Sequence, residues 1–307
     1  MRIALLGQQE FGKATLDAFL AQGHEVAGVF CRPEAVGSKP DALREAAEGL
    51  GLRVHQFRSL RAPEAGQAMR ELDADLGVMA YVLQFAPHSL VALPRHGTIQ
   101  YHPSLLPKHR GPSSISWPIL LGEAETGITV FRPTDGLDEG PVVLQKRCAI
   151  APDETLGELY FNKLFPMGVA ALLEAAELVV SGRHEERVQD ETQATYEGWV
   201  HDAESRIDWS RHGDQIHNLI RGCNPAPGAW TQLQGQRVFL FDCRRHPLHT
   251  FGGVRGQPGD IVAVTPTSIV FHAHGADIEV LRLRPEGGKK MGAGDYALQR
   301  GLEQVRR

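Results

Sequence analysis

The sequence predicts an α/β fold, in which a Rossmann-like, mostly parallel sheet is followed by a second, smaller β-barrel domain of the OB-like type. Short apolar runs alternate with amphipathic helical stretches in the first part of the chain, which is typical of βαβ units. After about residue 206 the apolar runs are short and alternating, with Gly and Pro between them, as in a small barrel or sandwich. We therefore expect one domain over residues 1–200 and another over residues 206–307.

The elements of the first domain follow from hydrophobic periodicity and from stop signals. Gly23 ends the first helix as a C′ glycine would, and Thr155 with Glu158 fits a capping box at the start of the last helix. The predicted strands cover residues 3–6, 25–30, 52–55, 76–81, 97–101, 126–131 and 142–150, the last two as a hairpin-like pair. The predicted helices cover residues 11–22, 42–51, 87–93 and 155–180.

The second domain follows a highly charged stretch, residues 183–193, which lacks periodicity and which we interpret as a connector. A short helix is expected over residues 216–221, before a rigid turn that contains Pro225 and Pro227. The predicted strands of this domain cover residues 238–241, 260–264, 268–271 and 278–281.

The composition, with 42% hydrophobic and 22% charged residues, is that of a globular protein that can bury a core. The net charge of −5 gives no overall attraction to nucleic acid, although a local basic patch can outweigh the total.

The N-terminal apolar run is too short for a signal peptide, and no segment approaches the ~18 apolar residues of a membrane span. The four cysteines lack CxxC spacing and read as reduced thiols. We expect a cytoplasmic protein without a membrane partner.

The most informative feature is the polar loop over residues 100–111, which leaves the carboxyl end of a predicted strand. A second loop, residues 134–140, leaves another strand end and carries Asp138. Ligands of open α/β sheets bind at this edge, so His102 and Asp138 are expected to converge there as a general acid/base pair. The alternatives are a structural histidine and a plain turn carboxylate.

Gln100 shares a strand face with His102, so its carboxamide could donate a hydrogen bond to a developing oxyanion. A solvated glutamine at a strand end is the alternative. The neighbouring Lys108, His109 and Arg110 form either a solvated basic turn or a contact for an anionic substrate tail.

Metal and nucleotide sites have weak support in the sequence. A metal site would have to use His96, His102, His109 and Asp138, whose spacing is wider than zinc sites usually show. The Gly7-x-x-x-x-Gly12 pattern lacks the dinucleotide and P-loop signatures, and close helix–strand packing explains it better. We expect neither a metal nor a nucleotide cofactor.

Two motifs carry a family resemblance. The run His-x-Ser-Leu-Leu-Pro-x-x-Arg-Gly over residues 102–111, followed by Asp-Gly-Leu-Asp-x-Gly over residues 135–140, resembles the 10-formyltetrahydrofolate-dependent formyltransferase family. That family includes methionyl-tRNA formyltransferase and the hydrolase domain of 10-formyltetrahydrofolate dehydrogenase. Residues 220–230 resemble the start of the family's C-terminal barrel-like domain, so the resemblance covers nearly the whole chain.

The resemblance implies a formyltransferase catalytic domain, a 10-formyltetrahydrofolate donor, and His102 and Asp138 as the catalytic pair. It places the pterin against the backbone of residues 81–85 and of the turn 135–138, with apolar side chains over its ring. The substrate-binding residues that it implies are Tyr81, Val82, Leu83, Gln84, Phe85, Ser104, Leu105, Arg110 and Asp135.

Gln100 departs from the family pattern, because transferases of the family carry Asn two residues before the histidine. The extra methylene moves the amide by about 1 Å, a displacement that can lower a rate about 100-fold. Residues 101–104, 164–166 and 31–33 resemble the hydrolase domain of the dehydrogenase, whereas residues 288–291 resemble the tRNA enzyme.

The formyl acceptor therefore stays open. One interpretation is transfer to an amine, either on initiator Met-tRNA or on a small molecule such as an amino sugar. A second is hydrolysis to tetrahydrofolate and formate, with water as the acceptor. A third is a folate- or RNA-binding module without activity. A basic stripe that joins both domains would favour tRNA.

Overall fold

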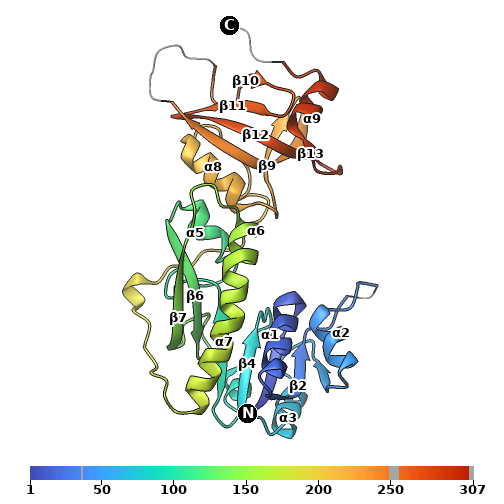
Figure 1. Cartoon of the computed structure of the whole chain (residues 1–307), viewed down its shortest axis with the longest axis vertical. Helices are drawn as coiled ribbons and strands as arrows, with labels where there is room; N and C mark the ends of the chain where they lie inside the picture. Colours follow the sequence, from blue (N-terminus) through green and yellow to red (C-terminus); the bar gives the residue numbers. More distant parts are fainter. Residues whose placement is uncertain (36, 249–255, 304–307) are drawn as a thin grey trace. The chain divides into compact units, whose positions relative to one another are not determined.

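The structure is a computed structural model that describes residues 1–35, 37–248 and 256–303. The chain divides into two compact units, which we call the N-terminal and C-terminal units (Figure 1). The N-terminal unit consists of Met1–Ser114, Gly127–Cys148 and Phe161–Glu197. The C-terminal unit consists of Ile115–Thr126, Ala149–Tyr160 and Gly198–Arg307. These units differ from the linear segments 1–200 and 206–307, because two internal segments join the C-terminal unit.

The two internal segments belong to the C-terminal unit because helix α8 (Gly213–Gly222) holds them. α8 packs against α5 (Ser116–Leu120), where Gly222 leaves no room for a side chain beside Leu120. Arg221 donates from Nη1 to the carbonyl oxygens of Ala151 and Glu154, at 3.2 and 3.0 Å. The hydrophobic periodicity of a single segment cannot predict such contacts between residues distant in the chain.

The N-terminal unit contains a seven-stranded sheet with the order β3-β2-β1-β4-β5-β6-β7. Strands β1 to β5 pair in parallel, and β6 runs antiparallel to β5. The mostly parallel, Rossmann-like sheet predicted from the sequence is therefore confirmed. The strands are β1 (Arg2–Gly7), β2 (Glu25–Cys31), β3 (Val54–Gln56), β4 (Leu76–Ala80), β5 (Thr98–His102), β6 (Glu125–Phe131) and β7 (Val142–Ala149).

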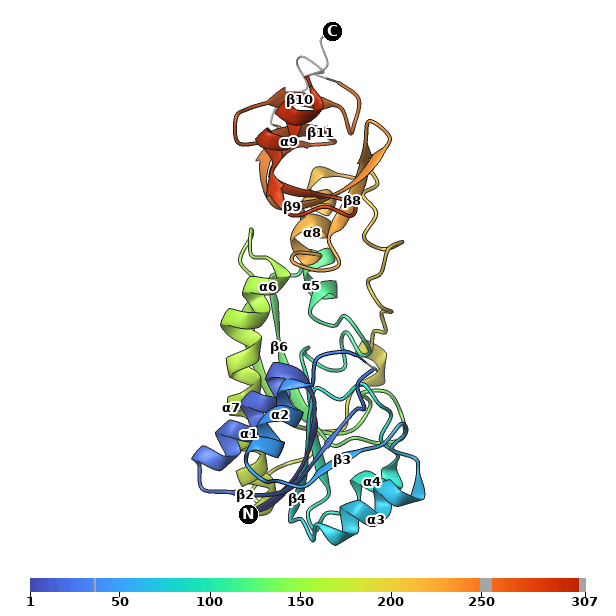
Figure 2. The same cartoon turned by 90° about the vertical axis from the view of Figure 1, so that its right-hand side faces the viewer.

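Helices cover both faces of this sheet (Figure 2). α1 and α7 pack on one face, and α3 and α4 share a buried apolar cluster with β1 and β4 on the other. The helices of this unit are α1 (Gln9–Ala21), α2 (Ala42–Gly49), α3 (Pro63–Glu71), α4 (His88–Val91) and α7 (Phe165–Val180), with a 3₁₀ turn at Glu191–Gln193. The sequence did not predict α3, whose buried face, Ala65, Ala68 and Met69, is short and consists largely of small residues.

The single helix expected over residues 155–180 is interrupted. α6 (Leu156–Leu159) is followed by a π-helical turn (Tyr160–Leu164), and α7 then begins with a proline in its first turn. Pro166 has no N–H to continue the regular ladder, which accounts for the interruption at this place. The predicted capping box between Thr155 and Glu158 is confirmed.

Tyr101 fixes the orientation of β5. Its ring stacks on Phe11 of α1, with centroids 4.4 Å apart, and lies so close to Gly168 of α7 that a Cβ there would approach Tyr101 within 2.4 Å. Because side chains alternate along a strand, burial of Tyr101 on this face turns Gln100 and His102 to the opposite face.

The turn after β1 shows the close packing expected for Gly7 and Gly12. A Cβ on Gly7 would lie 2.5 Å from the carbonyl oxygen of Ala80, and one on Gly12 would lie 2.9 Å from Leu43. The carboxylate of Asp41 accepts hydrogen bonds from Gln9 N at 2.9 and 2.7 Å, and so occupies the N-terminus of α1. That helix end is where a Rossmann fold ordinarily holds a phosphate.

The C-terminal unit is built on an antiparallel sheet of six strands in which β10, β11, β12, β9 and β8 are successive neighbours, and β13 also pairs with β12. The smaller β domain is therefore confirmed, while its closure into a barrel stays a prediction. The elements are β8 (Ala229–Leu233), β9 (Gln236–Pro247), β10 (Ile261–Val264), β11 (Ile269–Ala273), β12 (Ala276–Pro285), β13 (Met291–Gly292) and α9 (Ala293–Arg300). Within the described ranges, no helix is long and apolar enough to cross a bilayer.

His217 of α8 is a buried histidine in the C-terminal unit, 3.3 Å from the Asp153 carboxylate. Burial and the nearby cation of Arg221 lower the pKa of His217 to about 4, with Asp153 and Asp214 opposing and Arg245 reinforcing this shift. The folded-state pKa lies below the ordinary value of 6.5, so folding is penalised when the ring must be protonated. The stability is therefore complete above about pH 6.5 and is lost as the pH falls toward 4.

We expect His217→Gln to reduce the loss of unfolding free energy between pH 7 and pH 4.5 by roughly 2–3 kcal/mol. Urea unfolding of the full chain, followed by tryptophan fluorescence at both pH values, measures this difference. All four tryptophans, Trp117, Trp199, Trp209 and Trp230, belong to the C-terminal unit and report on it. Equal losses in the wild type and the variant would contradict the prediction.

Candidate active site

His102 and Asp138 lie together, as the sequence predicts. His102 is the last residue of β5, and Asp138 lies in the turn between β6 and β7. His102 Nδ1 is 3.6 Å from Asp138 Oδ2, and each side chain is only 7% exposed. A buried imidazole beside a buried carboxylate is the arrangement that general acid/base chemistry needs.

The ring of His102 has a defined orientation. Its Nε2 is 2.8 Å from the backbone carbonyl oxygen of His109. A carbonyl oxygen only accepts, so Nε2 carries a hydrogen and donates it. Nδ1, which faces Asp138, is therefore the nitrogen that can gain and lose a proton while the ring stays in place.

The Asp138 carboxylate is held by a backbone N–H group. Its Oδ2 accepts from Gly111 N at 2.9 Å, and its backbone has the left-handed φ of 56°. The turn is tightly closed at Gly140, since a Cβ there would lie 1.6 Å from the carbonyl oxygen of Arg132. The glycine of the Asp-x-Gly sequence is thus required by the conformation that aims the carboxylate.

Gln100 lies on β5 opposite Phe131 and is partly exposed. It shares a face with His102, so the structure brings all three predicted catalytic residues to the carboxyl end of β5. Whether its amide contacts a substrate stays a prediction.

Ser104 and Leu105 shape the loop that follows β5. Ser104 is fully buried, and its hydroxyl donates to the carbonyl oxygen of Lys108 at 2.7 Å. Thr129 Oγ1 donates to the carbonyl oxygen of Ser104 at 2.7 Å and accepts from Leu106 N at 3.1 Å. Leu105 packs near Gly127, where a Cβ would come within 2.6 Å of it. These contacts give both residues a role in the loop, and their contact with a substrate stays a prediction.

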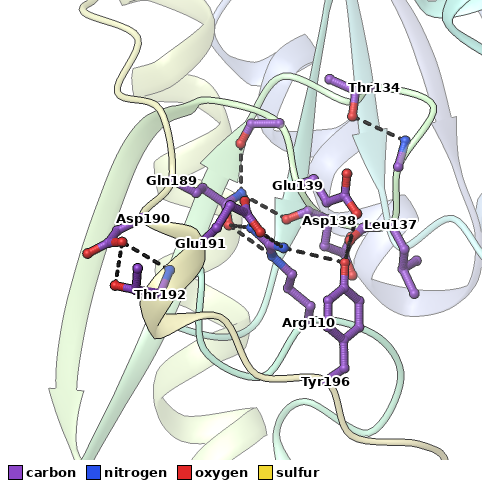
Figure 3. A network of polar contacts seen from close by, with 12 residues as sticks. Arg110, Thr134, Leu137, Asp138, Glu139, Gln189, Asp190, Glu191, Thr192 and Tyr196 are labelled. Carbon is purple, nitrogen blue, oxygen red and sulfur yellow. Dashed lines mark hydrogen bonds and ion pairs between the residues drawn. The ribbon is translucent and has the colours of Figure 1, made fainter.

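Arg110 differs from its expected role. The predicted contact with a substrate tail needs free donors, but the guanidinium is 1% exposed and makes five hydrogen bonds with Gln189, Glu191 and Tyr196 (Figure 3). These contacts use all five N–H groups of arginine. Hydrogen bonding to Glu191 raises the pKa of Arg110, and the same pairing lowers the pKa of Glu191. Arg110 is thus a structural anchor behind the site.

The loop after β4 lies beside the turn that carries Asp135 and Asp138. Asp135 Oδ1 accepts from His88 N at 2.9 Å, which ties the end of this loop to the turn. Gln84 donates from Nε2 to the carbonyl oxygen of Phe57 at 2.8 Å, and Val82 packs on the apolar cluster of α3 and α4. The large side chains that remain exposed in the two segments are Tyr81, Leu83, Phe85 and Leu137. The two segments that the resemblance assigns to the pterin are therefore neighbours.

A polar hollow of about 680 Å³ lies where β1 and β2 end, and Leu83 of the loop after β4 also borders it. Its polar lining comes from Gln8, Gln9, Glu10, Arg32, Glu34, Ser38, Lys39 and Asp41. The sequence did not indicate these residues, because no motif marks them.

The connector contributes to the site in a way that its sequence does not reveal. Gln189 is buried, and the residues that follow it pair with the loop after β5: Arg110 N donates to the carbonyl oxygen of Thr195 at 3.0 Å, and His109 N donates to Thr195 Oγ1 at 2.8 Å. No signal in the sequence indicated these contacts, because nothing in it marked Arg110 as buried.

The four residues that a metal site would need do not lie together. His96 precedes β5 and His102 ends it, so they lie at opposite ends of one strand. His109 Nδ1 is 3.2 Å from Glu197 Oε2, and His102 reaches His109 only through its backbone. In residues 1–35, 37–248 and 256–303 no three metal-binding side chains form a cluster.

Comparisons with known proteins agree with this geometry. The formyl transferase family profile matches residues 1–175, and the formyl transferase C-terminal domain profile matches residues 200–301. Mouse mitochondrial 10-formyltetrahydrofolate dehydrogenase is 37% identical over 96% of this chain, which spans only 33% of that protein. Methionyl-tRNA formyltransferase of Heliobacterium modesticaldum is 37% identical over 97% of this chain and 96% of its own length.

Solved structures share the fold. An N-formyltransferase from Helicobacter canadensis superposes with a TM-score of 0.70 at 16% identity, over 91% of this chain and 98% of that one. HypX from Aquifex aeolicus, solved with tetrahydrofolic acid, gives a TM-score of 0.65 at 18% identity, over 97% of this chain and 47% of that one. With both profiles matched and the resemblance confirmed, the chain belongs to the formyl transferase family.

Proposed function

We propose that the chain transfers the formyl group of 10-formyltetrahydrofolate to a nucleophilic acceptor. The observation that carries the proposal is the convergence of His102 and Asp138, 3.6 Å apart, at the carboxyl end of β5. Membership of the formyl transferase family supports the formyl chemistry. The names of the dehydrogenase relatives support the folate donor.

The donor fits the two neighbouring loops. Main-chain groups of the loop after β4 and of the turn that carries Asp135 can match the amide-like edge of a pterin. Exposed Leu83, Phe85 and Leu137 supply apolar side chains that would cover its ring. The hydrogen bond from His88 N to Asp135 holds the two loops side by side.

The reaction begins when the acceptor, an amine or a water molecule, attacks the formyl carbon. His102 Nδ1 takes a proton from the acceptor, and the Asp138 carboxylate stabilises the resulting imidazolium ion. Gln100 donates an amide hydrogen bond to the oxygen that becomes negative in the tetrahedral intermediate. The bond between the carbon and N10 then breaks, and N10 takes the proton back from the imidazolium. The products are tetrahydrofolate and either a formylated amine or formate.

Two acceptor classes have specific support. Transfer to an amine is supported by the methionyl-tRNA formyltransferase relative, which the chain matches over nearly its full length. Hydrolysis is supported by Gln100, which stands where family transferases carry Asn, and by the dehydrogenase relatives. A module that only binds folate or RNA is the third candidate.

The purified full-length chain incubated with 10-formyltetrahydrofolate tests the proposal. We expect tetrahydrofolate to form, either without an added acceptor or only when a small amine, an amino sugar or charged initiator tRNA is present. Formate release without an acceptor would identify hydrolysis. Folate binding by titration without product in any reaction would contradict catalysis and favour the binding module.

Gln100→Leu tests the amide at this position. Leucine has a similar volume but no donor, so we expect kcat for donor turnover to fall about 100- to 1,000-fold, the usual effect of losing one oxyanion donor. Gln100→Asn keeps an amide and should retain more activity than Gln100→Leu. Steady-state kinetics on both variants measures the effect, and a Gln100→Leu enzyme as fast as the wild type would remove Gln100 from the mechanism.

A further inference from the structure

Gln189 of the connector uses its whole hydrogen-bonding capacity between Arg110 and the catalytic turn (Figure 3). Its Oε1 accepts from Arg110 Nε and Nη2, at 3.1 and 2.9 Å. Its Nε2 donates to the carbonyl oxygens of Asp138 and Gly140, at 2.8 and 2.7 Å. A side-chain amide has two donor hydrogens and an oxygen with two lone pairs, so no capacity is left.

The chemistry of the two sides explains why an amide stands here. Arg110 offers only donors, whereas the carbonyl groups of Asp138 and Gly140 offer only acceptors. A residue between them must accept at one end and donate twice at the other. A carboxylate would face the two carbonyl oxygens with negative charge, and a cation would face the guanidinium, so Gln suits the position and Glu or Lys does not.

The chain of hydrogen bonds from Arg110 through Gln189 to the Asp138 turn, which we call the tether, acts on a strained part of the backbone. Asp138 has a φ of 56°, a conformation that costs energy for any residue except glycine. The hydrogen bond from Gln189 to the Asp138 carbonyl oxygen holds the peptide unit on which the catalytic carboxylate depends. Gln189 is 6% exposed, so its hydrogen bonds are shielded from competing water.

The other end of the tether is itself anchored. Arg110 binds both carboxylate oxygens of Glu191, at 2.6 and 2.9 Å, and its Nη1 lies 3.4 Å from the Tyr196 hydroxyl. The Tyr196 hydroxyl is also 3.1 Å from the carbonyl oxygen of Leu137, the residue before Asp138. The segment 189–196 thus reaches the turn that carries Asp138 through two separate side chains, those of Gln189 and Tyr196.

We infer that Gln189 is a positioning residue, which fixes the distance and direction of the Asp138 carboxylate toward His102. The inference rests on the proposed formyl transfer, because it assigns a role in that reaction. Gln189 touches neither His102 nor a reacting atom and acts through the backbone of Asp138.

Gln189→Glu tests whether the hydrogen bonds from Gln189 to the turn position the Asp138 carboxylate, because it leaves the contact with Arg110 in place. The variant keeps the oxygen atom that accepts from Arg110 and loses both donors to the turn. A displacement of about 1 Å at the reacting groups can lower a rate about 100-fold, so we expect kcat to fall roughly 10- to 100-fold with little change in KM for the donor. Gln189→Ala should lose a similar factor. Both variants leave buried hydrogen-bonding groups unpaired, so we expect a lowered Tm in each, and the kinetics are measured well below it.

The matched control is Thr192→Val in the same connector. Thr192 Oγ1 donates to Asp190 Oδ1 at 2.7 Å, away from the catalytic turn. This variant also loses one side-chain hydrogen bond, and we expect its kcat within twofold of the wild type.

A double-mutant cycle with Asp138→Asn completes the test. If Gln189 acts through the Asp138 carboxylate, Gln189→Glu should lower the residual rate of Asp138→Asn by less than twofold. A full additional loss in that background, or a Gln189→Glu enzyme as fast as the wild type, would overturn the inference while the proposed function stands. A wild-type chain that leaves 10-formyltetrahydrofolate unchanged under all acceptors would overturn both.

Discussion

His102→Ala is expected to lower kcat for 10-formyltetrahydrofolate turnover by about 1,000-fold, within the range that a positioned general base contributes. The substitution removes Nδ1, the nitrogen that faces Asp138 at 3.6 Å and that takes the proton of the acceptor in the proposed reaction. It also removes the donor to the His109 carbonyl oxygen, which holds the ring in place. Steady-state product formation measures the loss, and circular dichroism checks that the variant is folded.

Added imidazole sharpens this test. The variant leaves a buried space beside Asp138, so free imidazole should restore part of the rate in proportion to its concentration. His96→Ala is the matched control, since His96 lies at the other end of β5, and its kcat should stay within twofold of the wild type. A His102→Ala enzyme that keeps most of its turnover would remove the imidazole from the mechanism.

Asp138→Asn is expected to lower kcat by roughly 100- to 10,000-fold, because it replaces the charge that stabilises the imidazolium ion with a neutral amide. The fold should be retained. Asn tolerates the left-handed conformation of this position, and its side-chain oxygen can still accept from Gly111 N. The loss should therefore appear in kcat and not in Tm. Kinetics and thermal unfolding on the same preparation measure both.

Glu139→Gln is the control for this change. It neutralises the next residue of the same turn, whose exposed side chain points to Tyr196 and not to His102. Its kcat should stay within about threefold of the wild type. If Asp138→Asn were as active as Glu139→Gln, the carboxylate would have no part in the reaction.

The convergence of His102 and Asp138 that the sequence predicts is present in the structure, with the two side chains 3.6 Å apart. Parallel pairing of β5 with β4 brings His102 to the carboxyl edge of the sheet. β6 runs antiparallel to β5, with Phe131 opposite Gln100, so strand direction does not account for Asp138, which the turn after β6 carries back to His102. The packing reason for Gly7 and Gly12 was also confirmed, since both lie against neighbouring elements.

What the sequence could not predict depends on contacts between distant residues. Arg110 looked like an exposed basic residue available to a substrate, but its acceptors come from Gln189 and Glu191, 79 and 81 residues later. The charged connector showed no periodicity because it is held by individual side chains and not by a regular face. Helix α3 was missed for a related reason, since only tertiary burial of a few small residues identifies its inner face.

The contacts of Gln189 and Tyr196 with the Asp138 turn also limit where this domain can be joined to other sequence. The formyl transferase profile ends at residue 175, yet the contacts that fix the Asp138 backbone reach Gln189 and Tyr196. A gene fusion that joined new sequence directly after α7 would leave the turn without its support. The stretch of chain that supports the Asp138 turn therefore extends beyond the residues that the first formyl transferase profile matches.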